Sequence, residues 1–272
     1  MGADSASSIL RIGVIGHGAL GSTLTDLVAR PENVGLRITA VMDHGGVDRP
    51  EPVDEIDTLL QRSDVVVEAA GPGALRAHAG NILASGRTLV AASVGAFLQD
   101  DLWAILEDDQ PRGKLILSTG ALGGMDLIRA SSLADPAAKI RLNSRKRPQS
   151  LVQPWMDADM VKRLEMGPED EAFPVFVGQA REAARLFPAN LNVAGALAIA
   201  LGDPDRVSVQ LTADPRAVLT THHIELESTL GRGTFVIQNH PLEKNPATSG
   251  VVPWAILRCL RELASSSSYR FA

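Results

Sequence analysis

The first 140 residues alternate between short apolar runs rich in β-branched residues and longer segments with helical spacing. Such alternation is typical of βαβ units, in which helices join parallel strands. The apolar runs predict strands at residues 11–15, 37–41, 64–68, 88–92 and 114–118. The segments with apolar residues three and four positions apart predict helices at residues 19–29, 74–84, 98–106 and 122–133. This half therefore predicts a Rossmann-type, doubly wound parallel sheet within an α/β fold, formed by residues 1–118.

After Pro136 the pattern changes. Helices are predicted at residues 180–186 and 189–200, and residues 207–211, 218–227 and 234–238 then follow with period-two alternation. No helical segment separates these runs, so they predict a mainly antiparallel sheet with one covered face. Residues 119–245 are thus expected to form a smaller α+β domain. A final helix is predicted at residues 251–263, followed by a polar tail that we expect to fray.

The first predicted strand runs directly into the sequence G-H-G-A-L-G. In this strand-turn-helix context Gly16 allows a tight turn, Gly18 lets the backbone approach a pyrophosphate, and Gly21 permits close packing of helix on strand. A helix that begins with Ala19 and Leu20 presents free N–H groups and a positive dipole end to phosphates. The motif predicts a dinucleotide site.

The end of the second predicted strand bears on the choice of dinucleotide. Asp43 lies 22 residues after Gly21, where an acidic residue accepts hydrogen bonds from the adenosine ribose. A carboxylate there repels a 2′-phosphate, and residues 44–46 offer no arginine to hold one. NAD is therefore favoured, although Arg49 leaves NADP open. A flavin is disfavoured because aromatic residues make up only 4% of the chain and no second nucleotide motif is present.

Small residues follow the third predicted strand. Ala70 and Gly71 would let a cofactor lie across the carboxyl edge of the sheet. Tight turns alone would explain these residues equally well.

Charge and composition exclude several functions. The 26 basic and 32 acidic residues give a net charge of −6, which provides no field for a nucleic acid. The longest nearly apolar stretch, residues 191–201, has about half of the roughly 20 residues that cross a bilayer. The first ten residues lack a targeting pattern, so a cytosolic location is expected. The single cysteine, the scattered histidines and the missing G-x-S-x-G motif exclude an internal disulfide, a metal site and a serine hydrolase of that type.

Several longer motifs resemble one family. They are STGALGGMD at residues 118–126, RKRP at 145–148, LFPANLNVAGALA at 186–198, THHIE at 221–225 and NPATS at 245–249. With the glycine motif, they make the chain similar to the small, two-domain L-aspartate dehydrogenases that feed NAD biosynthesis in some prokaryotes. The resemblance implies oxidation of L-aspartate to iminoaspartate, which hydrolyses to oxaloacetate and ammonia. It also implies a homodimer, and a C-terminal segment, residues 246–272, that joins the dinucleotide domain.

By position, the resemblance implies that Ala121 and Asn192 contact the nicotinamide and that His222 is the catalytic histidine. The chain departs from the family in three places. Residues 220–224 are T-T-H-H-I where relatives commonly have Asn-x-His-x-Ile, and the segment at residues 227–231 also differs. Arg147 stands where proline is usual. These departures bear on the identity of the substrate more than on the type of reaction.

The strand pattern around His222 gives an independent test. With period two, His222 shares a face with Ile224 and Leu226, whereas His223 shares the more polar face with Glu225. A histidine on an apolar face is commonly a core residue. With an ordinary pKa of about 6.5, however, an imidazole suits proton transfer from the substrate amine or from the water that attacks the imine.

A dicarboxylic amino acid needs cationic or donor-rich contacts. Arg145 and Lys146, expected in a connection after a strand at residues 139–142, are candidates, although basic runs are commonly solvated loops. Thr248 and Ser249, expected at the N-terminus of the last helix, would add donors or simply cap that helix.

Two other functions stay open. One is an imine or enoate reductase of the dihydrodipicolinate reductase type. The other is a non-catalytic NAD-sensing protein, which would keep the glycines and Asp43 but would have no need of His222.

Overall fold

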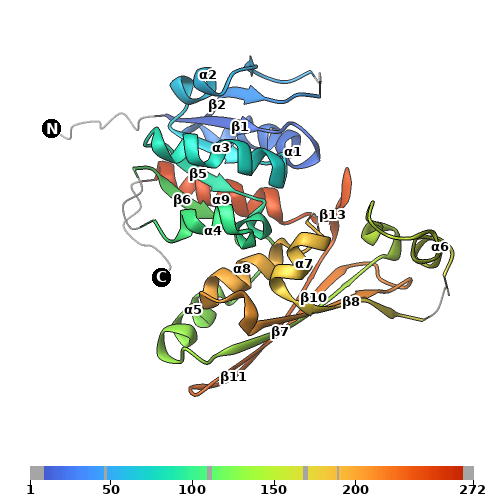
Figure 1. The fold of residues 1–272 in the computed structure, drawn as a ribbon. Coiled ribbons are helices and arrows are strands. Elements are labelled where there is room, and N and C mark those ends of the chain that lie inside the picture. Colours follow the sequence, from blue (N-terminus) through green and yellow to red (C-terminus); the bar gives the residue numbers. More distant parts are fainter. Residues whose placement is uncertain (1–8, 46–47, 109–111, 168–170, 189, 266–272) are drawn as a thin grey trace. The chain divides into compact units, whose positions relative to one another are not determined.

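The computed structural model describes residues 9–45, 48–108, 112–167, 171–188 and 190–265. It divides the chain into two compact units (Figure 1). The first unit comprises Met1–Ala92, Asp108–Ser118 and Pro253–Ala272, and the second comprises Ser93–Glu107 and Thr119–Val252. The N-terminal segment and most of the polar tail discussed above lie outside the described residues, as does Ala189 at the start of a predicted helix.

The first unit is built on a parallel sheet of six strands in the order β3-β2-β1-β4-β5-β6. The strands are β1 Leu10–Ile15, β2 Leu36–Met42, β3 Pro52–Val53, β4 Val65–Glu68, β5 Thr88–Ala91 and β6 Lys114–Leu117. The central strands are buried on both faces, which explains their continuous apolar runs. The chain reverses its direction of travel across the sheet between β1 and β4. The doubly wound prediction is confirmed.

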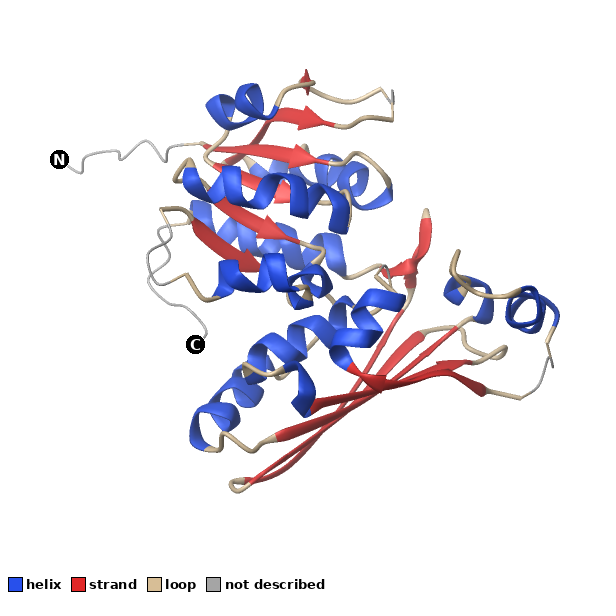
Figure 2. Cartoon of the chain, viewed as in Figure 1, coloured by secondary structure: helices blue, strands red, loops and turns tan. Residues whose placement is uncertain are grey.

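The described residues of the first unit form four α-helices, and helices lie against its sheet in Figure 2. They are α1 Ala19–Val28, α2 Ile56–Arg62, α3 Pro72–Ala84 and α9 Val252–Ala264. Although α9 follows every element of the second unit in sequence, it packs on the first unit through the buried side chains of Ile256, Leu257 and Leu260. The guanidinium of Arg30 also lies 5.2 Å from the centre of the Trp254 ring.

The second unit contains a five-stranded sheet in the order β11-β10-β7-β9-β8. Its strands are β7 Lys139–Lys146, β8 Phe173–Gln179, β9 Val207–Ala213, β10 Thr220–Ser228 and β11 Gly231–Asn239. All neighbours are antiparallel except β7 and β9, so the prediction of a mainly antiparallel sheet is confirmed. A small antiparallel pair follows, formed by β12 Pro241–Leu242 and β13 Asn245–Ser249.

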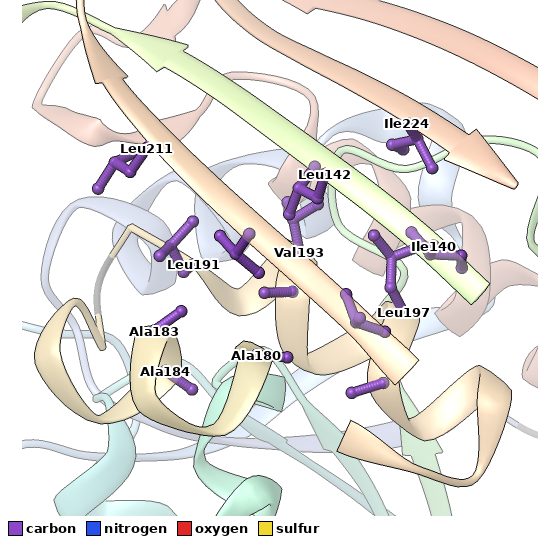
Figure 3. Packing of buried hydrophobic residues seen from close by; sticks show 14 of the residues in the cluster. Ile140, Leu142, Ala180, Ala183, Ala184, Leu191, Val193, Leu197, Leu211 and Ile224 are labelled. Carbon is purple, nitrogen blue, oxygen red and sulfur yellow. The ribbon is translucent and has the colours of Figure 1, made fainter. Parts of the chain in front are cut away.

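Helices and strands of the second unit share one hydrophobic core. Its α-helices are α4 Asp100–Leu106, α5 Met125–Ala134, α6 Ala158–Met166, α7 Ala180–Leu186 and α8 Asn192–Leu201. Figure 3 shows side chains of the strands, such as Ile140 and Leu142, lying against Val193 and Leu197 of α8. Alanines at the contact face of α7 let that helix approach closely. The opposite face of the sheet carries exposed Val177 and Val236.

Residues 93–107 belong to the second unit, although the sequence assigned them to the dinucleotide domain. The 3₁₀ helix Val94–Leu98 contacts α8 so closely that an ideal Cβ on Gly195 would lie 2.5 Å from the Cα of Gly95. Arg181 of α7 donates to the carbonyl of Leu98, whose side chain joins the core of this unit. Packing, which the local pattern does not encode, decides this boundary.

Candidate functional site

The glycine turn of the first unit has the geometry that the motif predicts. Gly16 has φ +94°, and an ideal Cβ there would lie 2.7 Å from the Cα of Ala70. An ideal Cβ on Gly21 would lie 1.9 Å from the Gly16 carbonyl oxygen, whereas one on Gly18 would meet no atom within 4 Å. The helix that follows begins at Ala19 without a capping side chain. Its first N–H groups are therefore available to an anion on the open side of Gly18.

Asp43 follows β2 and is ionised. Its Oδ2 accepts from the backbone N–H of His17 at 2.5 Å, and its Oδ1 accepts from that of Gly45 at 2.6 Å. These hydrogen bonds to the charged form lower the pKa of the Asp43 carboxyl. Each carboxylate oxygen keeps a further lone pair that can accept from a ribose hydroxyl.

Arg49 is the residue that kept NADP binding possible in the sequence analysis. In the structure its side chain contacts other residues of the first unit. Its Nε donates to the Val41 carbonyl at 3.0 Å, and its Nη2 pairs with Asp54 at 2.9 Å. The Arg49 side chain is only 10% exposed. Its guanidinium is therefore committed to the β2–β3 edge.

Ala70 and Gly71 lie at the end of β4, beside the glycine turn. Both are positioned by Glu68, whose Oε1 accepts from their backbone N–H groups at 2.9 and 2.7 Å. Gly71 has φ +103°, a conformation that favours glycine. Sequence reasoning missed Glu68, and a carboxylate ending an otherwise apolar strand is the signal that would have found it.

His222 lies on the covered face of the second unit's sheet. The strand alternates as predicted, because His222, Ile224 and Leu226 are buried and His223 points to the other face. In register, His222 of β10 stands opposite Ser144 of β7. The Ser144 Oγ and His222 Nδ1 atoms are joined by a buried hydrogen bond of 2.8 Å.

Lys146 lies on the same face of β7, two residues beyond Ser144. It is 4% exposed, and its Nζ donates to the Ala247 carbonyl of β13 at 3.0 Å. Among the described residues no carboxylate forms an ion pair with it. Burial lowers the pKa of the Lys146 ammonium to about 8.

Burial, and then the positive charge of Lys146, lower the pKa of His222 to about 3. The imidazole is therefore neutral across the ordinary pH range. Sequence reasoning began from a pKa of about 6.5, which applies to a solvated ring rather than to a buried one beside a cation.

The basic run at residues 145–147 does not act as one cluster. The expectation of a connection after residue 142 is wrong, because β7 continues to Lys146 and successive side chains alternate between faces. Arg145 is half exposed on the opposite face, with its Nε 3.7 Å from Asp214 Oδ2. Arg147 donates to the Ala217 carbonyl. Only Lys146 lies on the face that carries His222.

The sequence predicted Thr248 and Ser249 at a helix N-terminus, but the structure places them elsewhere. They belong to β13, and α9 begins three residues later, at Val252. Ser249 is buried and its Oγ has no hydrogen-bond partner within the described protein, and the same holds for Nδ2 of Asn239. Lys146 donates to the Ala247 carbonyl, and Ser249 lies two residues further along this strand.

Ala121 and Asn192 also lie in the second unit. Ala121 is buried in the turn that follows β6. Asn192 begins α8, and its Oδ1 accepts from the N–H of Gly95 at 3.0 Å. This contact fixes the side chain and leaves its amide NH₂ group available as a donor.

The described part of the chain contains no group of three or more His, Cys, Asp or Glu residues able to hold a metal ion. In the same part, no helix is long and apolar enough to span a bilayer. A cytosolic location stays a prediction from the sequence.

A parallel sheet with a dinucleotide-type glycine turn, followed by a unit that holds a buried histidine beside a buried lysine, defines a pyridine-nucleotide-dependent oxidoreductase. The family model described as homoserine dehydrogenase, NAD binding domain, matches residues 16–117. The model described as aspartate dehydrogenase, C-terminal, matches residues 126–263. The chain belongs to the L-aspartate dehydrogenase family.

Individual relatives agree with this assignment. The L-aspartate dehydrogenase of Bradyrhizobium diazoefficiens is 34% identical, with 95% of this chain and 93% of the relative covered. That of Methanocaldococcus jannaschii is 33% identical, with 94% and 97% covered. The crystal structure of aspartate dehydrogenase from Thermotoga maritima has a TM-score of 0.73 at 24% identity, covering 97% of this chain and 99% of that one.

Proposed function

We propose that this protein oxidises L-aspartate with NAD to iminoaspartate, which hydrolyses to oxaloacetate and ammonia. The observation that carries the proposal is the buried pair of His222 and Lys146, which share one face of the sheet without a carboxylate partner among the described residues. A buried cation without a counter-ion is costly unless a ligand supplies the negative charge. Family membership makes L-aspartate the favoured ligand.

Within this proposal Lys146 binds one substrate carboxylate. Its Nζ donates one hydrogen bond, to the carbonyl of Ala247 at 3.0 Å, and an ammonium has three donors. The Oγ of Ser249 and the hydroxyl of Thr248 are further candidate donors from β13. Arg145 is a weaker candidate, because it lies on the opposite face of the sheet and forms an ion pair with Asp214.

His222 is proposed as the general acid and base. Its neutral imidazole can take a proton from the substrate amine, or from the water that attacks the imine. A bound carboxylate would offset the charge of Lys146, which depresses the pKa of His222, and would therefore make the ring more basic. A nicotinamide cofactor held by the glycine turn would supply the acceptor for the hydride that leaves the substrate Cα.

For the cofactor we propose NAD over NADP. The site would use the turn residues Gly16, Gly18, Ala19, Leu20 and Gly21, the Asp43 carboxylate, and Ala70 and Gly71 at the end of β4. Asp43 is charged where a 2′-phosphate would lie, and Arg49 is held by Val41 and Asp54. Ala121 and the amide of Asn192 are proposed to contact the nicotinamide.

A panel of L- and D-amino acids with NAD and NADP, followed by absorbance of the reduced nicotinamide, tests the activity. We expect turnover with L-aspartate, and a higher kcat/KM with NAD than with NADP. The KM for L-aspartate should rise above about pH 8, where Lys146 loses the proton that attracts a carboxylate.

Two results would contradict these proposals. Absence of turnover with L-aspartate, and also with oxaloacetate plus ammonia in reverse, would reject the proposed reaction and return attention to the reductase and NAD-sensing alternatives. A higher kcat/KM with NADP would mean that Asp43 does not face the ribose.

We also propose that the chain forms a homodimer through the exposed face of the five-stranded sheet. Val177 and Val236 are 70% and 58% exposed on that face, among polar side chains such as His223. Light scattering should give about twice the chain mass of 28.8 kDa, and Val236→Asp should shift the protein toward the single-chain mass. A wild-type protein that stays at the single-chain mass at micromolar concentration would contradict the dimer.

A further inference from the structure

One side chain of the second unit contacts His222 but lies outside every motif of the sequence. Ser144 is 0% exposed, and its Oγ lies 2.8 Å from Nδ1 of His222. Ser144 and His222 are directly opposite in the β7–β10 register, in the centre of the sheet. Ile140 and Leu142 precede Ser144 on the same buried face. Ser144 and Lys146 are therefore the two polar residues on the buried face of β7, after Ile140 and Leu142.

The contact fixes which nitrogen of His222 is left for chemistry. Nδ1 is occupied by Ser144, so Nε2 is the nitrogen that can serve a substrate. A serine hydroxyl can accept from Nδ1–H or donate to Nδ1, and only the first arrangement leaves the lone pair of a neutral imidazole on Nε2, where a general base needs it. A hydroxyl can accept from Nδ1–H both before and after Nε2 takes up a proton, so one contact supports the ring in both states.

We propose that Ser144 is a positioning residue for His222: its Oγ accepts a hydrogen bond from Nδ1–H, which holds the ring and leaves the lone pair of the neutral imidazole on Nε2. The inference rests on the proposed role of His222 as acid and base. When Nε2 accepts a proton, the contact becomes a hydrogen bond from a charged donor, which is stronger than a neutral one. Ser144 therefore stabilises the product of proton transfer more than the starting state.

Replacing the hydroxyl tests this role. Ser144→Ala should lower kcat about 10- to 100-fold, the size of a lost hydrogen bond to a charged group, and leave the KM for L-aspartate within about threefold. Ser144→Thr keeps the hydroxyl and should retain most of the wild-type kcat. A purely structural role would not separate kcat from KM in this way.

A spectroscopic measurement tests the same contact without turnover. ¹⁵N NMR of His222 should show one neutral tautomer in the wild-type protein, with the proton on Nδ1, and a mixture of tautomers in Ser144→Ala. If the enzyme fails to oxidise L-aspartate but these spectra are as expected, the proposed function fails while the positioning of His222 by Ser144 stands.

Ser63 of the first unit provides a matched control. It is also 0% exposed, and its Oγ donates to the Leu59 carbonyl at 2.7 Å. Ser63→Ala removes an equally buried hydroxyl and should leave kcat and the His222 spectrum unchanged. A wild-type tautomer with the proton on Nε2, or an unchanged kcat in a folded Ser144→Ala protein, would overturn the proposal. If Ser144→Ala does not fold, the wild-type spectrum decides.

Discussion

Replacing His222 with alanine is expected to lower kcat with L-aspartate by about 10²–10⁴-fold, the usual contribution of a general acid or base. His223→Ala should change kcat little, because this neighbouring residue points to the opposite face of β10. The affinity for NAD should stay within a few-fold in both variants, because the proposed nucleotide contacts of the glycine turn belong to the first unit. Steady-state kinetics and calorimetric titration with NAD measure these quantities.

The pair of adjacent histidines makes the result easy to interpret. A larger loss from His223→Ala would mean that the functional face of β10 is the one opposite to His222. Small and equal losses from both variants would mean that neither ring transfers protons, which would favour the reductase or the NAD-sensing alternative.

The second large effect is expected in the glycine turn. Gly21→Ala places a Cβ 1.9 Å from the carbonyl oxygen of Gly16, which cannot retreat freely because Gly16 itself lies against Ala70. We expect the free energy of unfolding to fall by about 1–3 kcal/mol or more, as for other overpacked sites. The affinity for NAD should fall at least tenfold, because the turn that presents the helix N-terminus is distorted. Urea unfolding and calorimetric titration measure the two effects.

Gly18→Ala is the matched comparison. Its Cβ would meet no protein atom within 4 Å, so the free energy of unfolding should change by less than about 1 kcal/mol. NAD binding should still weaken, because the added methyl group occupies the side from which a pyrophosphate approaches. If Gly18→Ala binds NAD as tightly as wild type, the phosphates do not lie against this turn.

The sequence predicts the central sheet of the first unit well because strands buried on both faces appear as continuous apolar runs. The five predicted strands agree with β1, β2, β4, β5 and β6 to within one or two residues at each end. The shorter elements at the edge, β3 and α2, carry too few residues for a period to emerge. In the second unit, β8 was not predicted. Pro174 and Gly178 interrupt its apolar pattern, and several of its positions are exposed.

The residues of the candidate site also differ in how well the sequence predicts their positions. The glycine turn and the inward direction of His222 depend on local spacing, which a single sequence contains. The contact of Ser144 with His222 depends on the register between strands 78 positions apart, which local spacing does not determine. Lys146 was identified as a candidate, but its separation from Arg145 required knowing that β7 extends to residue 146.

The position of α9 constrains the order in which the protein can mature on the ribosome. Domains generally fold as they emerge, the N-terminal one first. Here the helix whose Ile256, Leu257 and Leu260 are buried in the first unit is synthesised after all of the second. Until translation has passed residue 260, the apolar surface of the first unit on which α9 packs therefore stays exposed. We expect chaperones to bind most strongly to nascent chains that stall before α9 is made.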